Sequence, residues 1–151
     1  MTIQDQVLTA LTAWRENRQS GVPGLQSIVN VIMNRAAKTG DSPYAVCTTH
    51  DQFTSINPPS TLTVAQTETG TWPVEADPQW QQALSLASQA AAGTLADITH
   101  GSTLYYAPYA IQSTATIILP SGQTVPFPKG WNADMVEYCV SVGGQLFFSE
   151  N

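Results

Sequence analysis

The chain has 151 residues, a length typical of one domain with a single hydrophobic core. Charged residues make up only 11% of it, against about 25% in an average soluble protein, and the net charge is -6. The 5 Lys and Arg residues form no run. Because phosphates and anionic lipids bind to clustered cations, we expect neither a nucleic acid nor a membrane partner.

Two helices are expected at the start of the chain. Residues 4–19 carry apolar side chains at helical spacing. That stripe consists of Val7, Leu8, Leu11 and Trp14. Glu16 falls near the end of this helix, roughly opposite the stripe. The residues Ser20-Gly21-Val22-Pro23-Gly24 break the helix, and a second helix is expected over residues 23–38.

The middle of the chain, residues 39–77, shows no periodicity and is rich in Thr, Ser, Pro and Asp. So long a loop inside one domain is unusual unless it forms a functional wall or lid, which is what we expect here. The remaining pattern predicts helices at 78–92 and 135–142, and strands at 104–106, 114–119, 124–127 and 145–148. The expected fold is therefore α+β, helix-dominated, with a small antiparallel hairpin or sheet, and residues 1–151 form one domain.

Several acids compete as candidate catalytic carboxylates. They are Glu16, Asp51 and the group Glu68, Glu75 and Asp77. Most Asp and Glu side chains are solvated surface groups without a catalytic role. Composition and periodicity alone therefore do not single out Glu16.

A thiol is the second candidate group. Cys47 with His50 or His100 could form a nucleophile and base pair, as in an amidase or peptidase, although this spacing is weakly specific. The two histidines show no metal-ligand spacing, and no glycine-rich nucleotide loop is present, so we expect neither a metal nor another cofactor. Cys47 and Cys139 match no metal spacing and are expected to stay reduced.

Aromatic side chains lie among many uncharged polar ones, since the chain holds 18 Thr, 12 Ser and 13 Gln. Sugar rings stack on aromatic faces and exchange hydrogen bonds with such polar groups. The aromatic candidates are Trp72, Trp80, Tyr105, Tyr106, Tyr109 and Trp131. The low charge fits a neutral polymer better than an ionic ligand.

The order of several motifs resembles the SleB-like cell-wall hydrolases, the spore-cortex-lytic family. The matching segments are Trp14-Arg15-Glu16-Asn17-Arg18, Gly21-Val22-Pro23-Gly24, the apolar helix that ends in Asn34-Arg35, Asp51-Gln52-Phe53-Thr54, and Gly101-Ser102-Thr103-Leu104-Tyr105-Tyr106. With the closing segment Gly144-Gln145-Leu146-Phe147-Phe148, which matches loosely, they run from about Trp14 to Phe148. The chain departs from the family at Leu146, where the family usually has His, and at Gln19, where it often has a second Glu. The loop from Ser55 to Gln79 is also hard to match.

This resemblance implies a lysozyme-like fold and cleavage of the bond between N-acetylmuramic acid (MurNAc) and N-acetylglucosamine (GlcNAc) in peptidoglycan. The family's catalytic glutamate corresponds to Glu16. It also implies that Gln52, Phe53, Tyr105 and Tyr106 bind substrate. The resemblance assigns a catalytic position to one acid, and ordinary hydrolysis uses two. We therefore expect a lytic transglycosylase that leaves 1,6-anhydro-MurNAc ends.

Three alternatives stay open: a hydrolytic muramidase, an amidase or peptidase that uses Cys47 with His100, and a non-catalytic wall-binding phage module. Because the N-terminus lacks an export signal, we expect synthesis in the cytoplasm and access to the wall through a holin or by injection, as for a phage lysin or tail enzyme. The expected partner is the peptidoglycan glycan strand, bound by a monomer.

Overall fold

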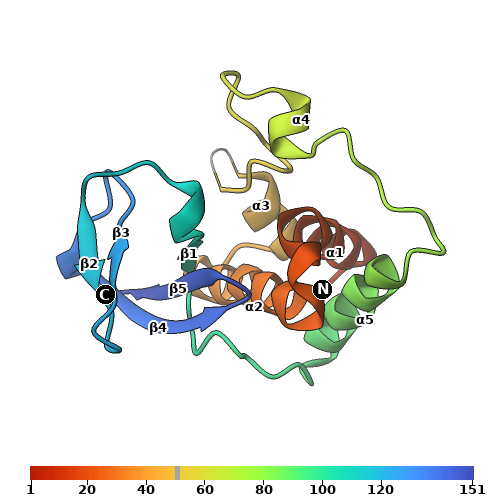
Figure 1. Cartoon of the computed structure of the whole chain (residues 1–151). Helices are drawn as coiled ribbons and strands as arrows, with labels where there is room; N and C mark the ends of the chain where they lie inside the picture. Colours follow the sequence, from red (N-terminus) through yellow and green to blue (C-terminus); the bar gives the residue numbers. More distant parts are fainter. Residues whose placement is uncertain (50–51) are drawn as a thin grey trace.

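The computed structural model describes residues 1–49 and 52–151 and shows an α+β fold dominated by helices. Helices α1 to α5 gather on one side of the molecule, and the strands gather on the other (Figure 1). Within the described residues, no helix is both long enough and apolar enough to cross a bilayer.

Three long helices form the first core, and local sequence signals fix their ends. Helix α1, Ile3–Asn17, starts with a capping box between Thr2 and Asp5. Helix α2, Gly21–Thr39, follows the short 3-10 turn η1, Arg18–Ser20, and ends where Gly40 adopts a left-handed conformation. Helix α5, Pro78–Ala92, has the expected bounds, because the Asp77 side chain caps its start and Gly93 ends it. The three predicted helices are confirmed, but α2 begins two residues earlier than expected. Residues 21–24 form its first turn, and the break between α1 and α2 lies at η1.

The segment 39–77 contains more structure than its sequence indicates. Helix α3, Pro43–Thr48, is capped by Ser42, and helix α4, Val64–Thr67, starts with a capping box at Thr63. The expectation of a loop without helices is therefore wrong here. Both helices are short and carry no repeating apolar stripe, so capping and tertiary contacts define them rather than periodicity.

The strands form two antiparallel sheets. One holds β1 (Leu104–Tyr106), β5 (Gln145–Glu150) and β4 (Val136–Val142) in the order β1-β5-β4. The other pairs β2 (Thr116–Ile118) with β3 (Thr124–Pro126). The strands expected near 104–106, 114–119, 124–127 and 145–148 are thus confirmed, with small differences at their ends. Two further 3-10 turns, η2 (Pro108–Ala110) and η3 (Ala133–Met135), complete the chain.

The helix expected at 135–142 is wrong, because these residues form strand β4. The segment alternates Val136, Tyr138, Val140 and Val142 with other residues, a β-branched and aromatic pattern that suits a strand. Gly143 and Gly144 have positive φ values of 57° and 77°, which allow the tight reversal into β5. Pairing with β5 over the length of β4 therefore outweighs the helical interpretation of a short apolar run.

Two apolar clusters result. The first joins α1, α2, α3 and α5 and includes the fully buried Leu25, Ile28, Ile32 and Phe53. The second lies within the strand part and is largely aromatic, built around Tyr106, Phe127 and Phe148. Tyr105 packs against the first cluster, so it lies between the helical part and the sheet.

Candidate functional site

The chain is tightly packed at the junction between α1 and α2. A Cβ atom added at Gly24 would lie 2.5 Å from Ser20 Cβ and 2.7 Å from the Asn17 carbonyl oxygen. Only glycine fits there, which gives a physical reason for Gly24 in the first turn of α2. The Ser20 hydroxyl also donates to the carbonyl of Gly143 in the β4–β5 turn, at 3.1 Å. The end of α1, where Glu16 lies, is thereby fixed against both α2 and the sheet.

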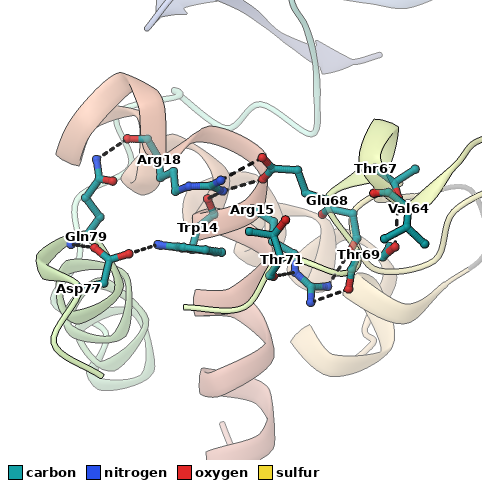
Figure 2. A network of polar contacts seen from close by, with 11 residues as sticks. Trp14, Arg15, Arg18, Val64, Thr67, Glu68, Thr69, Thr71, Asp77 and Gln79 are labelled. Carbon is teal, nitrogen blue, oxygen red and sulfur yellow. Dashed lines mark hydrogen bonds and ion pairs between the residues drawn. The ribbon is translucent and has the colours of Figure 1, made fainter. Parts of the chain in front are cut away.

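Arg15 attaches the long middle segment to the same end of α1, as Figure 2 shows. Its buried guanidinium donates to the carbonyls of Ser55 at 2.8 Å, Thr69 at 3.1 Å and Thr71 at 3.1 Å. Hydrogen bonds from a charged donor are stronger than neutral ones. One side chain therefore holds three points of the segment beside Glu16.

Arg18 adds a second attachment one helical turn further on (Figure 2). Its two terminal nitrogens bind the two Glu68 carboxylate oxygens at 2.6 and 2.9 Å. The guanidinium also lies over the Trp14 ring, 4.0 Å from its centroid, and the Trp14 indole N–H donates to Asp77 at 3.0 Å. Arg15 and Arg18, which lie on either side of Glu16 in the sequence, thus attach the middle segment to the end of α1.

Asn34 and Arg35, in the C-terminal part of α2, hold the segment that leads into β1. Asn34 donates to the carbonyl of Ser102 at 3.0 Å, and the Arg35 Nε donates to the carbonyl of Thr103 at 2.6 Å. Because Thr103 lies two residues before Tyr105, these bonds set the position of Tyr105. The motif residues therefore bring a tyrosine from β1 next to a glutamate on α1.

The Glu16 carboxyl lies in this partly buried junction, and its pKa is raised to about 7. Removal from water is the main cause, because burial penalises the charged form. The Tyr105 hydroxyl, the Arg35 charge and the Ser55 hydroxyl act in the opposite direction, and the negative charge of Glu68 raises the pKa further. A large fraction of Glu16 is therefore protonated near neutral pH.

Tyr105 stays protonated and can donate to Glu16. Its pKa is raised well above the ordinary value, first by burial and then by the neighbouring Glu16 charge. Its ring stacks on Phe147 with 5.6 Å between centroids, which restrains its orientation. Glu16 and Tyr105 are the two sequence-based candidates that the fold brings together.

The other candidate binding residues have different surroundings. Gln52 is exposed and lines a cavity beside Arg35. Phe53 is fully buried, and Arg35 lies over its ring, 4.8 Å from the centroid. Tyr106 is 7% exposed, and its hydroxyl donates to the carbonyl of Pro126 at 2.7 Å. Phe53 and Tyr106 therefore serve in packing in this structure.

The thiol candidate has poor geometry for catalysis. Cys47 is fully buried in α3, and burial raises the pKa of its thiol to about 12. Nucleophilic cysteines need an accessible thiolate, which this environment disfavours. His100 lies on an exposed turn with a positive φ of 56°. Both cysteines are free thiols, as expected, while His50 and Asp51 lie outside the described residues.

Two site residues, Arg35 and Ser55, were not predicted from the sequence. Arg35 ends the apolar helix of the resemblance, but nothing in the pattern indicates that its charge acts on Glu16. The Ser55 hydroxyl is buried and makes no hydrogen bond of full geometry with a described residue, yet it lies near enough to Glu16 to lower the pKa of that carboxyl. A single serine in a polar loop gives no sequence signal of such a position.

Comparison with known proteins adds no relative: no family model, curated protein or solved structure matches the chain.

Proposed function

We propose that this chain cleaves the MurNAc–GlcNAc bond of peptidoglycan, with Glu16 as the general acid. The observation that carries the proposal is the Glu16 carboxyl, partly buried at the end of α1 and with a pKa raised to about 7. A glycosidic oxygen is a poor leaving group and needs a proton as it departs. A carboxyl group that is still protonated near neutral pH can supply that proton. The motif order, from Glu16 to Tyr105, is similar to that of the SleB-like hydrolases and supports the same choice of substrate.

In the proposed first half of the reaction, Glu16 gives its proton to the glycosidic oxygen while the bond from that oxygen to the muramic acid C1 breaks. The Tyr105 hydroxyl lowers the pKa of Glu16 and so stabilises the carboxylate that forms. The nearby Arg35 charge favours the same ionised state. These groups act on Glu16 and do not themselves exchange protons with the sugar.

In the second half, we propose that the muramic acid's own C6 hydroxyl attacks C1. The Glu16 carboxylate takes the proton from that hydroxyl, which restores the acid and leaves a 1,6-anhydro end without consuming water. Hydrolysis would need a second carboxylate to act as base or nucleophile. Among the described acids, Glu68 is the candidate for this second role, because its negative charge raises the pKa of Glu16. Both of its carboxylate oxygens, however, already accept hydrogen bonds from Arg18. This commitment of Glu68 favours internal attack, for which the nucleophile is already tethered to the reacting ring.

The test is a mass spectrum of the products released from purified cell walls. We expect fragments one water lighter than hydrolytic muropeptides and resistant to borohydride reduction. If the products carry only muramic acid with a reducing end, the transglycosylase step is refuted, while cleavage by a hydrolytic muramidase remains supported. Release of free stem peptides would instead favour an amidase, and no release from walls of several chemotypes would contradict the enzymatic proposal.

A further inference from the structure

A cavity of about 340 Å³ opens beside the Glu16 site, between α2, α3 and the strands β1 and β5. Its charged and polar lining includes Arg35, Lys38, Asp41, Gln52, Thr103 and Glu150. The volume lies at the low end of the ~300–1,000 Å³ that is usual for small-ligand sites. Glu16 does not line the cavity, but Arg35 does, and Arg35 also acts on the Glu16 charge. The cavity is therefore a neighbour of the catalytic acid rather than its own binding cleft.

The described residues contribute four charged side chains to the cavity lining, and two of them satisfy each other. Lys38 Nζ lies 2.9 Å from a Glu150 carboxylate oxygen, and the Thr103 hydroxyl donates to the same carboxylate at 2.6 Å. These contacts also explain why the pKa of Glu150 is lowered. Neither Lys38 nor Glu150 thus needs a ligand as counter-charge.

The other two charges, Arg35 and Asp41, have no ion-pair partner among the described residues. The Arg35 Nε is bound to the carbonyl of Thr103, but its Nη1 is buried and makes no hydrogen bond with any residue in the described part of the chain. The Arg35 side chain as a whole is only partly buried and lines the cavity, so its charge is within reach of an anionic group there. Asp41 is exposed, and none of the described side chains binds its carboxylate.

We propose that this cavity binds a zwitterionic peptide group, with a carboxylate against Arg35 and an amine against Asp41. The occupant is the peptide branch of the same wall strand, so this inference rests on the proposed function. That branch carries free carboxylates and, where it has a dibasic residue, a free amine. A glycan strand without its peptides keeps the lactyl carboxylates of MurNAc but has no amine, because its amino groups are acetylated. Such a strand could not use Asp41. The cavity therefore makes the enzyme selective for strands that still carry their peptides.

Binding of a soluble probe tests this without any cleavage. The probe is the tetrapeptide L-Ala-γ-D-Glu-L-Lys-D-Ala with its amino terminus acetylated, so that the lysine amine is its one amine. It is compared with the same peptide acetylated also on the lysine amine. We expect the free peptide to shift the amide NMR signals of Thr39, Thr49 and Thr103. Acetylation should weaken binding about tenfold, which corresponds to ~1.4 kcal/mol.

Two matched variants sharpen the result. Asp41→Asn removes an exposed carboxylate that makes no structural contact with the described residues, so folding is not at risk. In this variant the free and acetylated peptides should bind equally well. Asp134→Asn removes an equally exposed aspartate outside the cavity and should retain the tenfold preference.

Three outcomes would overturn the inference: no binding of the free peptide at millimolar concentration, shifts confined to residues outside the cavity, or an amine preference that survives Asp41→Asn. The result is separable from that of the proposed function. A chain that cleaves walls but does not bind the peptide refutes only the cavity assignment, whereas a chain that binds the peptide but releases no fragments refutes only the enzymatic proposal.

Discussion

Replacing Glu16 with glutamine should change both activity and stability, in opposite directions. The substitution keeps the shape of the side chain but removes the proton that the reaction needs. General-acid catalysis contributes about 10²–10⁴-fold, so we expect wall-lysis activity to fall by that factor. In the unchanged protein, activity should decline as the pH rises past about 7, because the protonated form of Glu16 is then lost.

The stability effect follows from the same raised pKa. Between the ordinary value of 4.5 and about 7, folded Glu16 keeps a proton that the unfolded chain has released. The free energy of unfolding therefore falls as the pH rises through this window. At about 1.4 kcal/mol per pKa unit, the loss approaches about 3 kcal/mol above pH 7, an upper value because the side chain is partly exposed. A glutamine carries no such penalty.

Urea unfolding at pH 4.5, 6, 7 and 8 measures this effect. The stability of Glu16→Gln relative to the unchanged protein should increase across the series by up to about 3 kcal/mol. Glu137→Gln, on an exposed position of β4, is the matched control and should show no such trend and full activity. A Gln variant that stays active, or a stability difference that is independent of pH, would refute the assignment of Glu16 as a buried general acid.

Four further changes test the surroundings of the site. Tyr105→Phe removes a hydroxyl that lowers the pKa of Glu16, so the alkaline limb of the pH–activity profile should move to higher pH; an unchanged limb would contradict the contact. Gly24→Ala places a methyl group 2.5 Å from a neighbouring Cβ atom, and urea unfolding should show a loss of about 1–3 kcal/mol. Arg15→Met leaves three carbonyls without their hydrogen-bond donor, so the free energy of unfolding should fall by about 2–4 kcal/mol and proteolysis within residues 55–77 should be faster. Equal protease resistance would argue that Arg15 does not hold this segment. Cys47→Ser should leave lysis largely intact, and a thiol alkylator should not inactivate the folded protein, whereas inactivation that tracks Cys47 modification would favour the amidase alternative.

Local sequence signals were sufficient for the three long helices. Helix α5 shows this best, because Asp77 can cap it, Pro78 suits its first turn, and Gly93 supplies the left-handed residue at its end. Gly and Pro also indicated a break between the first two helices, although it lies at Arg18–Ser20, just before the residues that predicted it. These features depend on residues a few positions apart, and such residues are visible in the sequence as neighbours.

Strand β4 marks the limit of that reasoning. Its apolar residues are compatible with a short helix or a strand, and pairing with β5 together with the Gly143–Gly144 turn decides between them. A strand is completed by hydrogen bonds to another segment, so its own sequence only partly specifies it.

By itself, the sequence determined the helix-dominated α+β class, the close turn after α1, and Glu16 as a candidate through its motif. Only the tertiary structure decided that Glu16 has a raised pKa. Burial raises this pKa, and Tyr105, Arg35 and Ser55, which come from β1, α2 and the middle segment, limit the rise. A pKa is set by the charges and solvent around a carboxyl group in space, and the order of residues along the chain does not record those surroundings.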